Sequence, residues 1–406
     1  MSSPKILQSL IADRWLGAQA GRALHSAVNG QPVALTHEDS IDFEQALAYA
    51  RRTGVKNLLA LDFQQRAARL RALGLYLNEH KEQLYAISAH TGATRNDSWI
   101  DIEGGSGTLF AYASMGAAEL PSSNLMHEGP AFALGKGGQF MGTHVLVPRG
   151  GVAVHINAFN FPIWGLLEKF APSFLAGMPC IAKPATATSY LTEAAVRLLH
   201  ASGLLPQGSL QLVIGSSGDL LDQLIETDVV TFTGSADTAL MLRANANILR
   251  HSIPFNAEAD SLNCAILGPD VSADAPEFDL YVKELVREMT VKAGQKCTAI
   301  RRAIVPRHLL DPLASRLRER LAKITVGDPA IDGVRMGALA SKAQQSDVAD
   351  RLALLSHGNE VVFGERDGFS PQGQGASEGA FACPTLLLCQ QPLQNDAIHN
   401  IEAFGP

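Results

Sequence analysis

The sequence predicts an α/β fold in which helices flank a mostly parallel, doubly wound β-sheet. Short apolar runs predict the strands, and about 20–30 residues separate neighbouring runs, as βαβ units require. Helical segments lie in between, over Thr192–His200 and, more briefly, near Asp219–Ile225. The four predicted strands are residues 151–156, 179–184, 210–215 and 229–234.

Two further features precede this sheet. Residues 43–90 place apolar side chains at helical spacing with charges between them, which predicts an amphipathic helix or helix pair. Residues 128–150 combine Gly-rich turns with alternating side chains, which predicts a hairpin projecting from the first domain.

A second α/β segment is predicted beyond residues 254–260. We therefore expect two domains, over residues 1–259 and 260–406. A Gly/Ser-rich loop is expected over residues 364–380. The second segment consists of strands over 263–268 and 302–306 and helices over 278–291 and 309–323.

Composition narrows the class of protein. The 406 residues are 46% hydrophobic and 18% charged, which is typical of a globular protein with ample core. The net charge of −7 argues against a nucleic acid or an anionic membrane surface as partner. No apolar run reaches membrane-spanning length, and the N-terminus lacks a signal-peptide pattern. Five widely spread cysteines predict reduced thiols in the cytoplasm and no metal site.

Polar residues follow several of the predicted strands. Asn160 is suited to donate its amide to an oxyanion and Lys183 to bond a ribose or phosphate, since ligands collect at the carboxyl edge of such sheets. The alternatives are a turn cap and a solvated lysine. Gly234 and Ser235 open a helix whose N-terminus suits a phosphate, or they are an ordinary helix start. The usual GxGxxG fingerprint is missing.

Later in the chain, three more positions have both a structural and a chemical interpretation. Glu258 is a solvent-facing strand residue or a general base. Cys297 is a buried thiol or a nucleophile. Glu402 and Phe404 are a surface acid and a core aromatic, or ligand contacts.

The order of these motifs resembles that of the aldehyde dehydrogenase superfamily, across roughly residues 45–406. Five separated motifs occur in the order found in that family: Asn-Phe-Pro, Lys-Pro, Phe-Thr-Gly-Ser, Gly-Gln-Lys-Cys and Glu-Ala-Phe-Gly-Pro. The segments "INAFNFPIWG", "SIPFNAEADSLNCAILG" and "TGATRNDSW" resemble the sequences of one branch of this superfamily. Members of that branch oxidise CoA-linked semialdehydes in the aerobic catabolism of benzoate or of phenylacetate.

The resemblance implies a dinucleotide-binding domain of Rossmann type over residues 1–259, a catalytic thiol domain over 260–406 and a role for each motif. Cys297 would be the nucleophile, Asn160 an oxyanion donor and Glu258 the base that activates water. The remaining residues would bind the nicotinamide cofactor, and the substrate would be an acyl-CoA semialdehyde. The implied cofactor contacts are Phe159, Lys183, Thr186, Gly234, Ser235, Glu402 and Phe404.

Departures from the family pattern sharpen these expectations. Many NAD-preferring members carry an acid shortly after the Lys-Pro lysine, whereas this chain has Ala185, Thr186 and Ala187, so we predict that NADP is preferred over NAD. The hairpin over 128–150 resembles the subunit-bridging element of the family, which implies a homo-oligomer, with a dimer favoured. Family members usually continue beyond Phe-Gly-Pro, so the catalytic domain is expected to be incomplete at its C-terminus.

Two other classes compete with the dehydrogenase. A cysteine hydrolase or acyltransferase would need a histidine beside Cys297, and none of the 12 histidines lies in a recognisable partner motif. A non-catalytic binding or structural protein would keep the fold without the chemistry.

Overall fold

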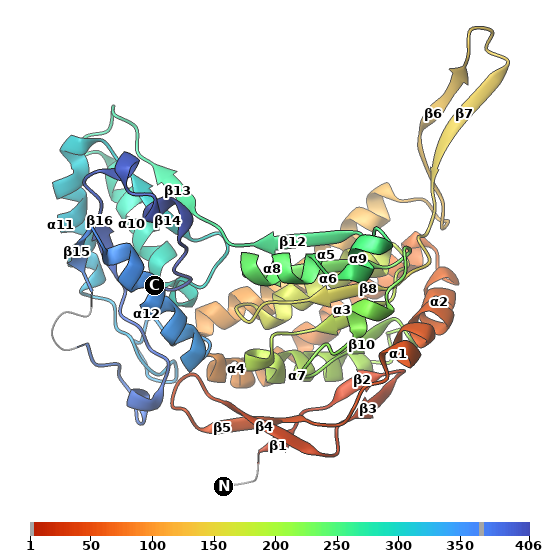
Figure 1. The fold of residues 1–406 in the computed structure, drawn as a ribbon, viewed down its shortest axis with the longest axis horizontal. Coiled ribbons are helices and arrows are strands. Elements are labelled where there is room, and N and C mark those ends of the chain that lie inside the picture. Colours follow the sequence, from red (N-terminus) through yellow and green to blue (C-terminus); the bar gives the residue numbers. More distant parts are fainter. Residues whose placement is uncertain (1–3, 365–368) are drawn as a thin grey trace. The chain divides into compact units, whose positions relative to one another are not determined.

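The computed structural model describes residues 4–364 and 369–406. Part of the predicted loop over 364–380 and the first residues of the N-terminal pattern lie outside the described residues. The chain forms two compact units (Figure 1). The first contains the residues up to Arg22, Ala34–Leu84 and Ile100–Ala259, and the second contains Ala23–Val33, Tyr85–Trp99 and Asp260–Pro406.

A seven-stranded sheet in the order β12-β11-β8-β9-β10-β2-β3 organises the first unit. Its five strands from β12 to β10 are parallel, which confirms the predicted fold class. At the other edge β2 pairs antiparallel with β10, and β3 with β2. The strands are β2 Ser9–Ile11, β3 Arg14–Leu16, β8 Ala153–Ile156, β9 Cys180–Lys183, β10 Leu210–Leu212, β11 Val229–Gly234 and β12 Phe255–Ala259.

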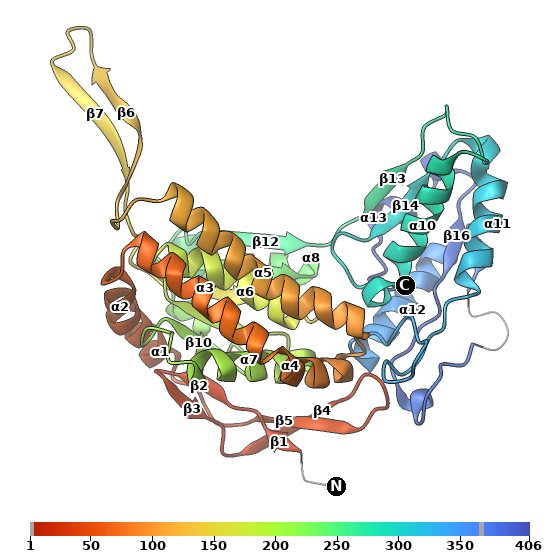
Figure 2. The same cartoon turned by 180° about the vertical axis from the view of Figure 1, so that it is seen from behind.

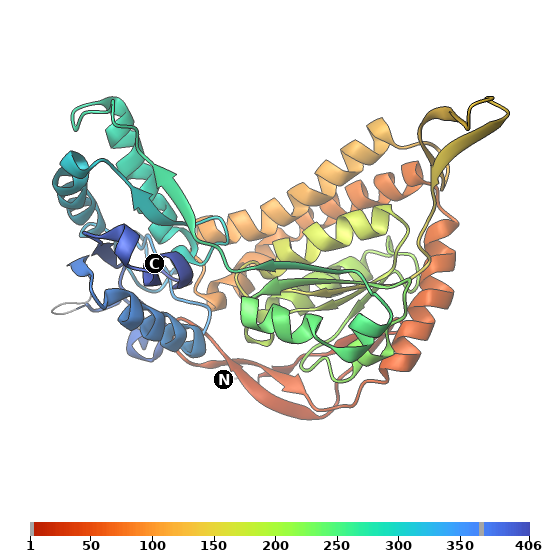
Figure 3. The ribbon, with the colours of Figure 1, turned by 45° about the horizontal axis from the view of Figure 1, so that its top comes forward.

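Helices cover both faces of this sheet (Figure 3). On one face α6 (Pro162–Leu175) and α7 (Ser189–Ala201) pack together and against α3 (Phe63–Glu79). On the other face α8 (Ala236–Arg243) contacts β11 and β12, and α9 (Ala246–Arg250) follows it. A buried apolar cluster lies between this sheet and the helices. It contains Val154, Ile181 and Val230 from the strands and Leu47 and Ile248 from the helices.

The helical region predicted over 43–90 is real but broken into pieces. It contains α1 (Phe43–Tyr49), a π-helical turn, α2 (Val55–Leu59), α3 and α4 (Lys81–Ser88). Asp62 restarts the chain as the N-cap of α3, because its carboxylate accepts the Gln65 N–H while the Gln65 side chain accepts the Asp62 N–H.

The sequence analysis missed α5 (Arg95–Glu119), the longest helix of the described residues. It lies beside α3 and α6 (Figure 2). The predicted hairpin is confirmed, as β6 (Met126–Leu134) and β7 (Phe140–Leu146) project from the first unit (Figure 1). A small separate sheet has the order β1-β5-β4, with β1 Lys5–Ile6, β4 Ala20–His25 and β5 Pro32–His37.

In the described part of residues 260–406, the second unit contains two small sheets and four α-helices. β13 pairs in parallel with β14, and β15 pairs antiparallel with β16. One apolar core lies between α10 and α11, where Phe278, Val282 and Leu313 are buried. The elements are β13 Asn263–Ile266, α10 Pro276–Thr290, β14 Ile300–Ile304, α11 Leu310–Leu321, α12 Lys342–Ser356, β15 Glu360–Phe363, β16 Leu386–Leu388 and α13 Ala397–Asn400.

The second unit also contains Ala23–Val33 and Tyr85–Trp99, which lie within the segment 1–259 of the predicted domain division. The two functional domains stay a prediction. Ala27 and Val28 belong to the buried cluster of the second unit, with Ala293 and Met336. The sequence could not show this, because the assignment depends on contacts with residues far along the chain. Every helix within residues 4–364 and 369–406 is too short or too polar to cross a bilayer.

Candidate active site

The topology of the first unit fixes where a ligand would bind. From β8 the chain proceeds to β9 and β10 on one side, whereas β11, which pairs with β8 on the other side, leads to β12. The strand order therefore reverses between β8 and β11. In open α/β sheets, ligands bind outside the carboxyl ends of the strands at such a switch point.

Asn160 lies in the turn that leaves β8 at this edge and is 7% exposed. The turn is held from both sides, because the Phe159 carbonyl accepts a hydrogen bond from Thr188 at 3.1 Å and Pro162 begins α6. Asp101 of α5 caps that helix, since its Oδ1 accepts the N–H groups of Ile163 and Trp164 at 3.1 and 2.8 Å. The position of Asn160 is thus set by packing and a cap.

Lys183 is the last residue of β9 and pairs in register with Ile156 of β8. Burial, together with the nearby charge of Arg22, lowers its pKa. Thr186 begins a 3-10 turn (Thr186–Thr188) three residues on, and Ala185 and Ala187 flank it. The turn over 185–187 contains one hydroxyl, that of Thr186, and no carboxylate.

Gly234 ends β11 and Ser235 is the N-cap of α8. The Ser235 Oγ accepts the Thr238 N–H at 3.4 Å and donates to the Thr238 Oγ1 at 2.9 Å. The cap therefore fixes the helix start at the strand edge, directly beside the switch point. The positive end of the helix dipole faces this edge.

Glu258, predicted in a strand, lies in β12 opposite Thr233 of β11. Its side chain is 48% exposed and forms a short ion pair with Lys169 of α6. Lys169 also lies 3.4 Å from Glu168. Burial alone would lower the pKa of Lys169. Its hydrogen bond to Glu258 and the charges of Glu168 and Glu258 outweigh burial and raise this pKa, so the lysine is charged at neutral pH.

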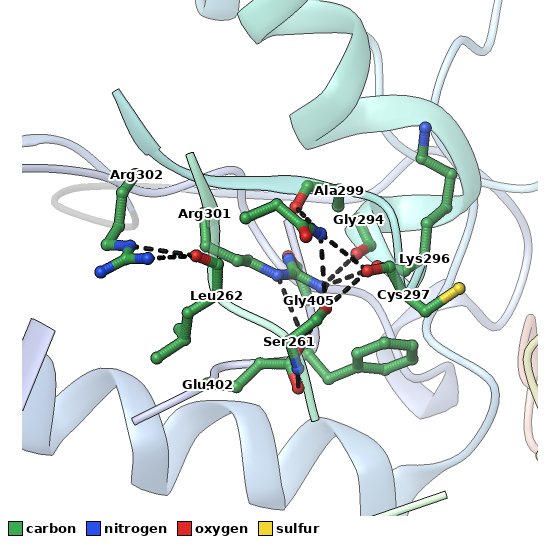
Figure 4. Close-up of polar contacts among 12 residues, drawn as sticks. Ser261, Leu262, Gly294, Lys296, Cys297, Ala299, Arg301, Arg302, Glu402 and Gly405 are labelled. Atoms are coloured by element: carbon green, nitrogen blue, oxygen red, sulfur yellow. Dashed lines mark hydrogen bonds and ion pairs between the residues drawn. The ribbon is translucent and has the colours of Figure 1, made fainter. Parts of the chain in front are cut away.

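In the second unit, a strained loop carries Cys297 (Figure 4). Lys292, Ala293 and Gly294 all have left-handed φ values, of 56°, 50° and 68°. A Cβ on Gly294 would lie 2.1 Å from the Gly405 carbonyl oxygen, so only glycine fits there. The Asp97 Oδ1 accepts the Lys292 N–H at 2.7 Å and stabilises this conformation. Such local strain persists only where surrounding contacts enforce it.

The Cys297 residue itself is exposed, while its backbone is tightly held. Its carbonyl accepts hydrogen bonds from the Ser261 Oγ at 2.5 Å and the Asn263 Nδ2 at 2.7 Å. Next to it, Lys296 forms a buried ion pair with Glu288 at 2.5 Å. The Sγ points away from this bonded backbone in Figure 4. The loop thus presents a thiol from a fixed position.

Arg301 connects this loop to the segment with Glu402 and Phe404. Its guanidinium donates to the carbonyls of Gly294 at 2.8 Å and Gly405 at 2.9 Å, and lies 3.5 Å from Glu402. Burial lowers the Arg301 pKa, against the opposing charge of Glu402. Burial likewise raises the Glu402 pKa, although the Ser261 N–H and Arg301 oppose it. The Phe404 ring lies 5.4 Å from the guanidinium carbon.

The predicted residues therefore form two groups, one in each unit. The first unit brings its group to the carboxyl edge of one sheet, and the second joins its group through Arg301 and Ser261. In the first unit the group is Phe159, Asn160, Lys183, Thr186, Gly234, Ser235 and Glu258, and in the second it is Cys297, Glu402 and Phe404.

Sequence reasoning missed the side chains that hold these groups. Lys169 looked like an ordinary polar position of an amphipathic helix, and Asp97 and Asp101 lie in a helix that was not predicted. Arg301, four residues after Cys297, lies in a pair of adjacent arginines, and the sequence does not show which of the two contacts Glu402. Within the described residues, no cluster of three or more His, Cys, Asp or Glu side chains is arranged for a metal ion.

Comparison with known proteins identifies the class to which this arrangement belongs. The family model described as aldehyde dehydrogenase family matches residues 19–406, so the chain belongs to the aldehyde dehydrogenase family. The predicted resemblance is thereby confirmed.

Individual relatives agree. The chain is 46% identical over 402 residues to the 3,4-dehydroadipyl-CoA semialdehyde dehydrogenase of Aromatoleum evansii, covering 98% of this chain and 78% of that protein. The fold is similar to betaine aldehyde dehydrogenase from Staphylococcus aureus in complex with NAD+, with a TM-score of 0.84, 21% identity, and coverage of 98% and 76%. A lactaldehyde dehydrogenase structure gives a TM-score of 0.84 at 22% identity, covering 100% and 81%.

Proposed function

We propose that this chain oxidises a CoA-linked semialdehyde to the carboxylic acid with NADP, using Cys297 as the nucleophile. The substrate we favour is 3,4-dehydroadipyl-CoA semialdehyde, the compound in the name of the relative at 46% identity. The observation that supports this chemistry most strongly is that Cys297 is exposed while the backbone of its loop is fixed. Side chains donate hydrogen bonds to the carbonyls of Cys297 and Gly294. Aldehyde oxidation itself follows from the family.

In the first step, the Cys297 thiolate attacks the aldehyde carbon and a C–S bond forms. The carbonyl π electrons move to oxygen, which gives a tetrahedral thiohemiacetal. The Asn160 amide and the Cys297 N–H are proposed to donate to this oxyanion. In comparable sites one such donor contributes about 3–4 kcal/mol to the transition state.

When bound, a nicotinamide cofactor would supply the acceptor for the hydride that leaves the thiohemiacetal carbon. A thioester on Cys297 remains, and Glu258 is proposed to take a proton from the water that hydrolyses it. Lys169 supports this role, because its ion pair with the partly exposed Glu258 side chain positions that side chain. Water addition and loss of the thiolate then release the acid and restore Cys297.

The residues present suit a dinucleotide. Within the described residues, the Lys183 ammonium and the Thr186 hydroxyl have no protein hydrogen-bond partner, so both are available to a ribose or phosphate. Ser235 opens α8 beside the switch point, where a pyrophosphate would lie. Glu402 already accepts from Ser261 and pairs with Arg301, but a carboxylate has lone pairs left for a ribose hydroxyl.

The preference for NADP is supported by charge. Lys183 and Arg22 lie close enough for one to lower the pKa of the other, and Thr186 follows in a turn without an acid. A 2′-phosphate would be attracted here, and NAD would lose that interaction. We therefore propose that NADP is the better cofactor and that NAD is used more weakly.

The β6–β7 hairpin is proposed to join subunits, with a dimer favoured. It exposes apolar side chains at its tip and along its length, among them Phe140 at 71% and Met141 at 61%. Exposed apolar area of this kind is typical of an interaction surface. A second copy of the chain would cover it.

The test is the reduction of the nicotinamide, followed by its absorbance, with 3,4-dehydroadipyl-CoA semialdehyde and either NADP or NAD. We expect turnover with NADP at a higher kcat/KM than with NAD, and none in Cys297→Ala. Cys264→Ala is the control, since it removes another exposed thiol. Absence of turnover with this substrate, while a simple aldehyde is oxidised, would reject the CoA-linked substrate.

A further inference from the structure

The second unit contains a large, strongly basic pocket that the proposed chemistry does not use. Its volume is about 1100 Å³, and its walls come from residues 94–96, α10, α11 and the turn over 329–335. Seven of the lining side chains are lysine or arginine and two are acidic. The whole chain has a net charge of −7, so this cluster runs against the general charge of the protein.

Three of these cations are not neutralised by the protein. Lys283 of α10, Arg320 of α11 and Arg335 form no ion pair or side-chain hydrogen bond within the described residues. Like charges that line one concavity repel one another, and a bound anion removes that cost. The pocket is therefore electrostatically prepared for a ligand with several negative charges.

Three further cations are only weakly compensated. Lys323 pairs with Glu319 at 2.7 Å, Arg316 with Asp279 at 2.8 Å, and Arg287 with Glu284 at 3.2 Å. These partners lie in water, where such pairs contribute little. The hydrogen bond from Lys323 and the nearby charges of Arg316 and Arg320 lower the pKa of Glu319, which shows the positive field of this wall.

The pocket shares its walls with the elements that hold the nucleophile loop. Thr290 and Val291 line it and directly precede Lys292, the first residue of the strained segment before Cys297. Asn96 also lines it and precedes Asp97, which accepts the Lys292 N–H. A long ligand anchored in the pocket could therefore extend along these elements toward the loop of Cys297.

Resting on the proposed function, we propose that this pocket binds the 3′-phosphoadenosine diphosphate end of the CoA-linked substrate. That group carries a pyrophosphate and a separate phosphomonoester, which together suit several cations spread over one concavity. Val286 and Ile324 add apolar wall for a base. The volume lies just above the usual range of small-molecule sites, which leaves room for a nucleotide. The pocket would thus select CoA esters over free aldehydes.

Kinetics on the full chain test this proposal with the double variant Lys283→Ala/Arg320→Ala. For the CoA-linked semialdehyde, KM should rise by at least about tenfold with kcat unchanged, because two charged contacts to phosphate are lost. For a short CoA-free aldehyde, KM and kcat should not change. Arg307→Ala is the matched control, an exposed cation of the same unit outside the pocket. An unchanged KM for the CoA substrate overturns the proposal.

A binding measurement separates failure of the pocket from failure of the proposed function. Adenosine 3′,5′-bisphosphate is titrated into the enzyme by calorimetry, with saturating NADP to block the cofactor site. Binding that the double variant loses and Arg307→Ala keeps supports the pocket, even if the favoured semialdehyde is not oxidised. No binding to the unaltered enzyme, or equal binding to the double variant, refutes the pocket whatever the substrate.

Discussion

The ion pair between Lys169 and Glu258 gives the clearest consequence of a single side chain. Lys169→Met should slow hydrolysis of the thioester by roughly tenfold or more, because Glu258 loses the charge that positions it. The first hydride transfer should be unaffected. Rapid mixing should therefore show a burst of reduced cofactor followed by a slow steady state.

Lys169→Arg is the control. It keeps the positive charge, so its burst should be much smaller than that of Lys169→Met. A purely structural role for Lys169 would lower the burst amplitude and the steady state together, and that outcome would contradict the assignment.

Thr186 decides the choice of cofactor. Thr186→Glu should lower kcat/KM with NADP by at least about tenfold, because a carboxylate would repel the 2′-phosphate. The value with NAD should stay the same or rise. Thr186→Val removes the hydroxyl without adding charge and should have the smaller effect. Steady-state kinetics with both cofactors measure the ratio of the two kcat/KM values. An equal loss of kcat/KM with NADP and with NAD would contradict a role of Thr186 in cofactor choice.

Strand β8 contains a buried histidine that makes folding sensitive to acid. Burial, with a smaller contribution from Lys169, lowers the pKa of His155 to about 3, and its ring bonds Thr231 and Ser173. The unfolded chain binds a proton on this residue below about pH 6.5, while the folded chain does not. Stability is therefore lost as pH falls below that value.

Between pH 7.5 and 5.5 this residue should remove about 1.4 kcal/mol from the free energy of unfolding of the first unit. Urea unfolding of the wild-type chain and of His155→Gln at both pH values measures it. The difference between the two proteins should shrink by that amount at pH 5.5. A constant difference would mean that His155 has the same pKa in the folded and the unfolded chain, which would contradict the lowered pKa.

Much of the fold could be predicted from local patterns. The strands β8, β9, β10 and β11 are short apolar runs, and their spacing alone indicated parallel pairing. β2 and β3 could not be foreseen, because they join the sheet through the distant pairing of Leu10 with Leu212. Helix α5 was hidden by its glycines, such as Gly104, where a Cβ would lie 2.5 Å from the Trp164 ring.

The candidate site shows the same division. Cys297, Glu258 and Lys183 belong to motifs that are continuous in sequence, so their place at strand ends or in a turn could be predicted. Asp97 and Lys169 act through residues far along the chain, Lys292 and Glu258. Their functions depend on tertiary contacts for which the sequence has no local pattern.

The assembly of the whole molecule is expected to depend on the β6–β7 hairpin. Phe140→Ser/Met141→Ser removes two of its exposed apolar side chains and should shift the protein to monomer, since the interface would lose apolar area. Light scattering after size-exclusion chromatography measures the mass. Leu280→Ser, an equally exposed apolar residue on α10, should leave the mass unchanged. Dissociation by the control alone, or by neither variant, would contradict the role of the hairpin.

The covalent step on Cys297 is tested most directly by intact-protein mass spectrometry of Glu258→Gln mixed with the CoA-linked semialdehyde and NADP. Without its base, the enzyme should accumulate one acyl group, and peptide mapping should place it on Cys297. The wild-type enzyme should show little of this adduct. Accumulation on another cysteine, or undiminished turnover of Glu258→Gln without any adduct, would contradict the mechanism.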